Sequence, residues 1–257
     1  FAEAARATGR KDFLDTAIAC AEFVCSNLLR EGRLLRTYKD GEARLNAYHE
    51  DYAYLIDGLL ALYEATFDER WYSTARDLTD KMVELFWDAE GGAFFFTSTD
   101  HEQLITRTKE AYDNAVPSGN SVAADTLQRL FLLTGESRYE ELAVTILKTL
   151  VGQVSRYPNA FGHLLCALDA YLGSPVEIAI AGDPGSRDTR ELLEAVNTIY
   201  HPDKGVALAK PGSLSVIKLL EGREMPGNSA VAYVCRNFVC KSPVTSPEAL
   251  LAALQNE

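Results

Sequence analysis

Two carboxylates, Asp51 and Asp113, stand where acid and base chemistry could take place, because each lies at the start of a predicted apolar helix. Two facing carboxylates can divide such work, one staying protonated as the acid while the other is ionised as base or nucleophile. We therefore assign Asp51 and Asp113 as the catalytic pair, with Glu50 and Glu110 as substitutes. The residues predicted to bind substrate around them are His49, Glu50, Tyr52, Glu110, Tyr112, Ser118, Asn120 and His163.

The ligand predicted for these helix starts is a small sugar. Helix N-termini that converge on a pocket supply partial positive charge and free backbone N–H groups, which favour hydroxyl-rich or anionic ligands. Tyr48, Tyr112 and the aromatic run 94–96 lie in or beside long connections and could form flat platforms for sugar rings. The run 94–96 could equally be a buried hairpin strand. No residue pattern indicates a cofactor or a metal site, and we expect neither.

A structural role for the same residues is the competing interpretation. Asp51, Ser118 and Asn120 are good N-cap residues, and Pro117 stands where a helix start tolerates proline. A lone histidine such as His163 is more often a core residue than a catalyst. One cap needs only one side chain, however, whereas each helix start offers three or four polar groups. This surplus favours a shared site.

An internal repeat indicates the elements that must position these residues. Thr, an aromatic residue five positions later and Ala nine positions later recur at 8–17, 66–75 and 134–143. Each copy marks a helix end, a short polar turn and a new helix. Helices that are apolar on most sides, expected inside, alternate with helices that have one wet face, expected outside. The predicted helices span residues 11–29, 49–66, 69–87, 118–134, 137–154 and 159–172.

These patterns predict a mainly α fold in residues 1–173, followed by a small α/β appendage in residues 174–257. Antiparallel hairpins of inner and outer helices form either a closed ring or an open stack. The long connections, 30–48 and 88–117, precede inner helices and should lie at one end. The turn AGDPGSRDT is interpreted as an ordinary turn, because it lacks the phosphate-binding patterns. In the appendage, strands are predicted at 176–182, 205–211 and 229–240, and helices at 188–200 and 247–255.

Composition limits the partners. A net charge of −12 and a pI near 4.9 argue against nucleic acid and against anionic membrane surfaces. No apolar run reaches the roughly 18 residues that a transmembrane helix needs, and no signal peptide is recognised, so we expect a cytoplasmic protein. The five cysteines are interpreted mainly as reduced, buried thiols. Cys235 and Cys240 are set apart as a pair for which a redox or metal role stays open.

Four stretches resemble the YyaL-like family, which includes spermatogenesis-associated protein 20. They are EDYAYLIDGLLALYEAT, LFWDAEGGAFFFT, AYDNAVPSGNSVAADTLQRLFLLTG and VAYVCRNFVCKSPVTSPEAL. The resemblance implies an N-terminal thioredoxin-like domain, outside these 257 residues, followed by an (α/α)6 toroid of the six-hairpin glycosidase type. Only part of that toroid would lie in this chain. The superfamily includes sugar 2-epimerases and unsaturated glucuronyl hydrolases, and the epimerases rely on two histidines, for which this chain offers His49 and His163.

Two functions follow as competing predictions. The first is a carbohydrate-active or carbohydrate-binding domain, either a glycoside hydrolase or an enzyme like the sugar 2-epimerases. The second is a non-catalytic binding or scaffold domain attached to the thioredoxin-like domain. The surroundings of the carboxylates discriminate between them, because a pair facing an open cleft favours glycoside chemistry. Carboxylates bonded only to helix N–H groups favour the scaffold.

Overall fold

A computed structural model describes residues 1–102, 105–225, 227 and 229–255. The chain forms two compact units. Unit 1 consists of residues 1–128 and 138–169, and unit 2 of residues 129–137 and 170–257. The sequence-based division into domains after residue 173 stays a prediction.

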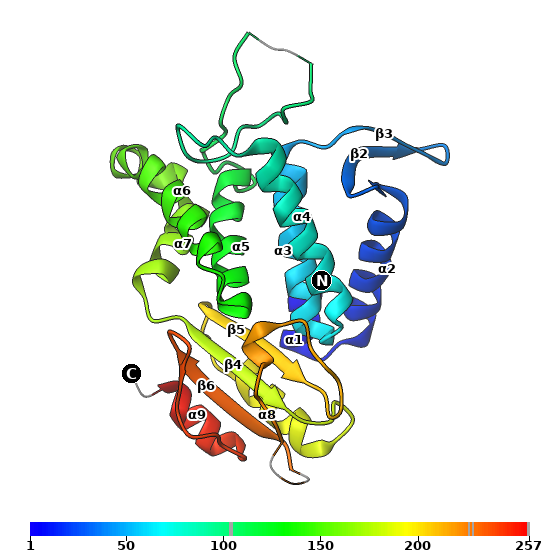
Figure 1. Ribbon diagram of the computed structural model, residues 1–257, viewed down its shortest axis with the longest axis vertical. Coiled ribbons are helices and arrows are strands. Elements are labelled where there is room, and N and C mark those ends of the chain that lie inside the picture. Colours follow the sequence, from blue (N-terminus) through cyan, green and yellow to red (C-terminus); the bar gives the residue numbers. More distant parts are fainter. Residues whose placement is uncertain (103–104, 226, 228, 256–257) are drawn as a thin grey trace. The chain divides into compact units, whose positions relative to one another are not determined.

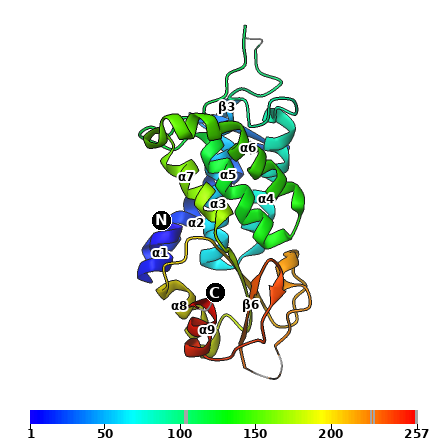
Figure 2. The same ribbon diagram turned by 90° about the vertical axis from the view of Figure 1, so that its left-hand side faces the viewer.

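Helices make up most of unit 1, and their positions confirm the helices predicted from the repeat. Residues 30–48, 88–102 and 105–117 lie at the end of unit 1 where α3, α5 and α7 begin (Figure 1, Figure 2). The helices of residues 1–172 are α1 (Ala2–Thr8), α2 (Lys11–Asn27), α3 (His49–Thr66), α4 (Glu69–Phe86), α5 (Gly119–Thr134), α6 (Ser137–Arg156) and α7 (Gly162–Leu172), with a 3₁₀ turn η1 (Pro158–Ala160).

Helices α3 and α4 show how the apolar pattern separates inside from outside. Helix α3 buries large side chains on most of its faces, including Tyr52, Ile56 and Leu59. Helix α4 buries one stripe that runs from Trp71 to Met82, and acidic side chains stand exposed on its other side. Burying each large apolar side chain stabilises the fold by about 1.5 to 3 kcal/mol, so these two helices anchor the core of unit 1.

The predicted mainly α fold class is wrong, because both units contain sheet and the fold is mixed α/β. In unit 1, the predicted polar connection 30–48 folds as a three-stranded antiparallel sheet of β1 (Leu29–Arg30), β2 (Arg33–Lys39) and β3 (Glu42–Asn46). Asp40 and Gly41 join β2 to β3 with φ of 53° and 82°. Asp-Gly favours this two-residue hairpin turn, since both positions need positive φ.

Unit 2 is built on a four-stranded sheet with strand order β5-β4-β6-β7. Strands β4 (Val176–Ala181) and β5 (Lys204–Ala209) are parallel and are joined through helix α8 (Arg187–Thr198). Strand β4 is buried along its whole length, as its central place in the sheet requires. The remaining elements are the 3₁₀ turn η2 (Lys218–Leu220), β6 (Val231–Arg236), β7 (Val239–Cys240) and α9 (Pro247–Gln255).

The predicted single strand 229–240 is a hairpin of two strands, β6 and β7. Asn237 and Phe238 form its turn with φ of 50° and 61°. The sequence hid this turn because Asn-Phe lacks the glycine that usually marks a hairpin. The other strands and helices of unit 2 lie within a few residues of their predicted positions.

Candidate functional site

Asp113 holds the start of helix α7 and the turn ahead of helix α5. Its Oδ2 atom accepts hydrogen bonds from the backbone N–H groups of His163 (2.8 Å) and Leu164 (3.2 Å). Its Oδ1 atom accepts a hydrogen bond from the N–H group of Ser118 at 2.7 Å. The backbone N–H of Asp113 donates to the carbonyl of Ala160 at 2.8 Å. The carboxylate therefore satisfies N–H groups that a helix start leaves without intrahelical partners.

Asp51 likewise serves the helix on which it lies. Its Oδ2 atom accepts a hydrogen bond from the N–H group of Tyr48 at 2.8 Å and completes a capping box at the start of α3. The guanidinium of Arg36 lies 3.5 Å from the same oxygen. Both carboxylates assigned as the catalytic pair thus bond to backbone N–H groups of helix starts.

The two polar residues in the first turn of α5 also make structural contacts. The hydroxyl of Ser118 accepts a hydrogen bond from the N–H of Ser121 at 3.1 Å. The buried amide of Asn120 accepts from the N–H of Phe94 (2.8 Å) and donates to the carbonyls of Phe94 (3.0 Å) and Glu110 (2.8 Å). Asn120 therefore ties the connection 88–117 to helix α5 at two points.

Replacing Asn120 by alanine is expected to lower the free energy of unfolding by about 3 kcal/mol, since two buried backbone groups of Phe94 and the part-buried carbonyl of Glu110 would lose their partner. Urea unfolding followed by far-UV circular dichroism measures this loss. Asn120→Asp is the matched control, because it keeps the shape and the acceptor but cannot donate to the two carbonyls. A loss below about 1 kcal/mol in both variants would show that Asn120 does not hold this connection.

His49 is sealed inside unit 1. Its side chain is 2% exposed and stacks on the ring of Phe94, with 4.6 Å between ring centroids. Burial lowers the pKa of His49 to about 3, so the imidazole is neutral at physiological pH. Its Nε2 atom has no hydrogen-bond partner among the described residues. A side chain in this position cannot reach a ligand in solvent.

The close contact between α3 and α5 explains the glycine of the PSGN segment. A Cβ atom on Gly119 would lie 2.7 Å from Nδ1 of His49 and 3.1 Å from the Cα atom of Glu50. Both distances are shorter than ordinary van der Waals contact, and the second involves backbone. Only glycine fits there without moving α3, so the PSGN segment serves helix packing.

Three of the five remaining predicted binding residues, Tyr52, His163 and Tyr112, differ in how exposed their side chains are. Tyr52 is buried, and its hydroxyl accepts a hydrogen bond from the N–H of Leu34 at 2.9 Å. His163 is half-buried, and its Nε2 atom has no hydrogen-bond partner within the described part of the chain. Tyr112 is 48% exposed and lies 5.2 Å from the ring of Phe161 between centroids. Of these three, Tyr112 offers an open surface.

The accessible part of the helix starts is acidic. Burial raises the pKa of Glu50, and the neighbouring charges of Asp51 and Glu110 raise it further, while Arg36 at 3.5 Å opposes them. Burial also raises the pKa of Tyr54, with Glu50 and Asp113 adding to the effect. The Tyr54 hydroxyl donates to the carbonyl of Pro117 at 2.5 Å. This surface suits neutral or cationic groups and repels anions.

A pH-dependent stability difference is expected between Glu50→Gln and the unchanged chain. Because the folded state raises the pKa of Glu50, its stabilising contribution is complete below the unfolded pKa and is lost as pH rises through the folded pKa. The melting temperature of Glu50→Gln relative to wild type should therefore increase between about pH 4 and pH 7. Scanning calorimetry across this range measures it. A melting-temperature difference between Glu50→Gln and wild type that stays constant, or that falls as pH rises, would contradict a raised pKa of Glu50 in the folded state.

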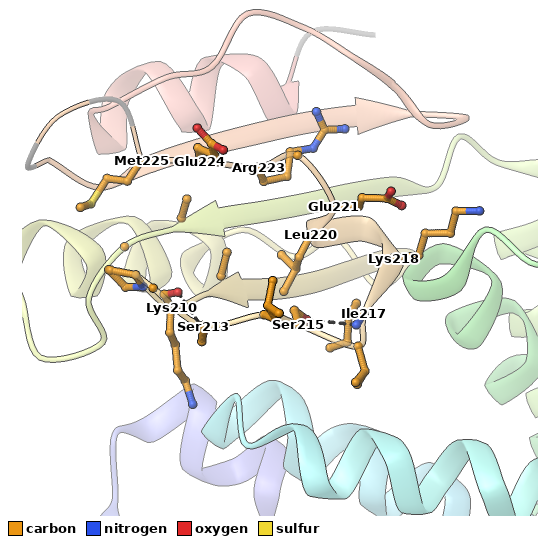
Figure 3. Close-up of a pocket in the computed structure, with 18 residues that line it drawn as sticks. Lys210, Ser213, Ser215, Ile217, Lys218, Leu220, Glu221, Arg223, Glu224 and Met225 are labelled. Atoms are coloured by element: carbon orange, nitrogen blue, oxygen red, sulfur yellow. Dashed lines mark hydrogen bonds between the residues drawn. The ribbon is translucent and has the colours of Figure 1, made fainter.

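The structure also contains a cavity of about 680 Å³ in unit 2 that the sequence did not indicate. It lies at the carboxyl ends of the parallel strands β4 and β5, where Ala181, Gly182 and Ala209 contribute to its wall. Segment 210–225 supplies the rest of the lining, including Lys210, Lys218 and Arg223 (Figure 3). The carboxyl edge of parallel strands is a common ligand position. The parallel β4-α8-β5 pattern was the available signal for it.

The turn AGDPGSRDT has the ordinary structure predicted for it. The Asp183 carboxylate accepts a hydrogen bond from the N–H of Gly185 at 2.9 Å, and Ser186 caps α8 by accepting from the N–H of Thr189 at 3.3 Å. Among the described residues, no group of three His, Cys, Asp or Glu side chains could hold a metal ion. Within the same residues, no helix is long and apolar enough to cross a membrane.

Cys235 and Cys240, the pair set apart from the other cysteines in the sequence, form a disulfide bond. The reason is the hairpin register, which places the two residues directly opposite each other on β6 and β7. The thiols of Cys20, Cys25 and Cys166 are free, but Cys20 and Cys166 are exposed and Cys25 is half-buried. The predicted free thiols are therefore confirmed for these three cysteines, but their predicted burial is wrong for Cys20 and Cys166.

Sequence comparison identifies relatives over nearly the whole chain. Human spermatogenesis-associated protein 20 is 33% identical over 93% of this chain, and its rat counterpart is 33% identical over 96%. The chain is therefore a homologue of spermatogenesis-associated protein 20. These matches support the spermatogenesis-associated protein 20 family, in agreement with the resemblance that was found in the sequence. An uncharacterized protein of Caenorhabditis elegans is 26% identical over 96% of the chain.

The homology to spermatogenesis-associated protein 20 covers only part of each relative. The chain spans about a third of their length, namely 32% of the human protein and 33% of the rat protein. No family model matches the chain. The name of these relatives states neither a substrate nor a reaction.

Proposed function

We propose that the helix starts of unit 1 belong to a non-catalytic binding and scaffold module within a longer protein. The observation that carries this proposal is the surroundings of Asp113. Both of its carboxylate oxygens accept backbone N–H groups, at 2.7, 2.8 and 3.2 Å. A carboxylate that holds two helix starts in this way is committed to structure.

The other members of the predicted catalytic set support the same proposal. Asp51 closes the capping box of α3, and His49 is buried with a pKa of about 3. A general acid or base must reach the proton that it transfers, and its pKa should lie near the working pH. His49 meets neither requirement, which counts against the epimerase-like pair of His49 and His163. The distances therefore favour capping over sugar chemistry.

The surface left for binding consists of Glu50, Glu110, Tyr54 and Tyr112. Glu110, Tyr54 and Tyr112 are exposed and Glu50 is half-buried. Carboxylates next to exposed aromatic rings can bind hydroxyl-rich or cationic groups, including basic side chains of a protein. As the partner we propose the thioredoxin-like domain that the family resemblance implies.

Carbohydrate binding is the second candidate, and the exposed ring of Tyr112 close in sequence to Glu110 is the observation that favours it. A flat ring beside hydrogen-bonding groups is suited to a sugar face. This candidate needs no acid and base pair, so it is compatible with the capping roles of Asp51 and Asp113. Hydrolysis or epimerisation would need catalytic groups beyond these two.

Thermal shift measurements separate the two candidates. The chain is melted with a panel of neutral monosaccharides, disaccharides and uronic acids, and Glu110→Gln and Tyr112→Ala serve as surface variants. A ligand at one hundred times its dissociation constant adds about 2.7 kcal/mol of stability. The scaffold proposal expects no selective shift. A shift caused by one sugar and abolished in both variants would overturn it in favour of carbohydrate binding.

A further inference from the structure

Arg223 in unit 2 lies beside the disulfide bond between Cys235 and Cys240. Its Nη2 atom is 2.8 Å from Sγ of Cys240 and 3.9 Å from Sγ of Cys235. The guanidinium also lies 5.1 Å from the centre of the Tyr233 ring. Arg223 lines the cavity of unit 2 as well (Figure 3), so the cavity extends to the residue that contacts the disulfide.

The guanidinium has no strong acceptor while the disulfide is intact. Arg223 is half-buried, its Nε atom has no hydrogen-bond partner, and it forms no ion pair with a carboxylate of the described residues. A disulfide sulfur is neutral and accepts hydrogen bonds weakly. A thiolate at the same position would be a charged acceptor for a charged donor, which makes a much stronger bond. The surroundings of Arg223 are therefore better matched to the reduced pair than to the oxidised one.

We propose that Cys235 and Cys240 form a thiol–disulfide exchange site that is reduced by a dithiol, with Arg223 stabilising the thiolate that is released. The exposure of the two cysteines indicates which sulfur the dithiol attacks. Cys240 is half-buried and follows Val239, which is exposed, whereas Cys235 is 1% exposed. The incoming thiolate therefore attacks Sγ of Cys240, and the sulfur of Cys235 leaves.

The exchange balances with the dithiol alone. Attack by one dithiol thiolate forms a mixed disulfide with Cys240 and breaks the bond to Cys235, which leaves as a thiolate 3.9 Å from Nη2 of Arg223. The second thiol of the dithiol then attacks the dithiol sulfur that is bonded to Cys240. This attack breaks the mixed disulfide and releases Cys240 as a thiolate beside the guanidinium. Of the two protons that the dithiol gives up, one ends on Cys235 and the other passes to solvent, so Cys240 stays a thiolate beside Arg223. The protein pair gains two electrons, and the dithiol becomes a cyclic disulfide.

The alternative is that the disulfide bond only stabilises the fold. The geometry of the hairpin does not favour this alternative. The bond closes a loop between residues that are only five positions apart. A cross-link over so short a loop removes less entropy from the unfolded chain than one over a long loop. Strands β6 and β7 are already paired in register at Cys235 with Cys240 and at Arg236 with Val239. The bond therefore adds little that the hairpin lacks.

Redox equilibration of the folded 257-residue chain tests the proposal. The chain is equilibrated with defined ratios of reduced and oxidised dithiothreitol, quenched with acid and alkylated, and the peptide with Cys235 and Cys240 is quantified by mass spectrometry. Arg223→Gln is expected to lower the equilibrium constant for reduction about tenfold, which corresponds to about 30 mV for a two-electron couple. Arg223→Lys keeps the charge and should stay within about threefold of wild type.

Matched variants keep the outcome interpretable. Arg190→Gln removes an exposed arginine of the same unit and should leave the equilibrium constant unchanged. Arg223→Met is a second charge-free variant, to be used if Arg223→Gln fails to fold. An equal equilibrium constant in wild type and the charge-free variants would overturn the role of Arg223. A wild-type disulfide that is reduced only after urea has unfolded the chain would show that the bond is structural and would overturn the exchange site.

Discussion

Replacing Asp113 by alanine is expected to lower the melting temperature of the chain by roughly 6 to 12 °C. The substitution removes the charged acceptor of three backbone N–H groups, those of Ser118, His163 and Leu164. Losing a helix cap and its charged hydrogen bonds costs about 3 kcal/mol in total. One kcal/mol corresponds to roughly 2 to 4 °C for a chain of about this length. Thermal denaturation followed by circular dichroism at 222 nm, the α-helical band, measures the change.

Asp169 provides the matched control, because it is an exposed aspartate on α7 away from the start of the helix. Asp169→Ala should change the free energy of unfolding by less than about 0.5 kcal/mol. Asp113→Asn should fall between the two, since an amide keeps one acceptor but places a donor against backbone N–H groups. If Asp113→Ala melts at the same temperature as Asp169→Ala, the Asp113 carboxylate is not a helix cap and is free to act in catalysis or ligand binding.

Acidification is expected to destabilise unit 1 through His49. Burial lowers the pKa of His49 from 6.5 to about 3 in the folded state. The sign follows from proton linkage: the stabilising contribution is complete above the unfolded pKa and is lost as pH falls toward the folded value. Between pH 7 and pH 4 this amounts to about 3 kcal/mol, taking about 1.4 kcal/mol for each pH unit below the unfolded pKa. Urea unfolding at several pH values measures the loss.

His49→Phe isolates the contribution of His49 from that of the carboxylates, which also titrate in this range. Phenylalanine keeps a ring stacked on Phe94 but takes up no proton, so the variant should lose less stability on acidification. The difference between the two pH profiles should be flat above about pH 7 and grow below it. Parallel profiles for the variant and the unchanged chain would show that His49 is not sealed from solvent.

The sequence predicted the helices better than the fold class. Apolar spacing placed α3, α4 and α5 within a residue or two of their ends, because each buries a continuous stripe or most of its surface. The sheet of β1, β2 and β3 was missed because charged side chains dominate this hairpin and mask its alternation. The Asp40-Gly41 pair was the available signal for a β-hairpin, and it predicts the hairpin more strongly than the polar composition argues against it.

The sequence predicted which candidate residues lie together, and their catalytic or binding role stays a prediction. The order of residues brought Asp113, Ser118 and His163 to the same end of unit 1, where hydrogen bonds join them. It could not show that backbone N–H groups occupy both oxygens of Asp113, because that depends on how α5 and α7 meet in space. The contact of Arg223 with Cys240 was hidden for the same reason, since strand β6 lies between them in the sequence.

The most direct test of the capping account is amide hydrogen exchange in wild type and Asp113→Ala, with Asp169→Ala as control. Helix-start amides normally exchange readily because they lack intrahelical partners. We expect protection at Ser118, His163 and Leu164 in wild type, its loss in Asp113→Ala, and no change in the core of α3. Unchanged protection of these amides in Asp113→Ala would contradict the account and would return Asp113 to consideration as a catalytic residue.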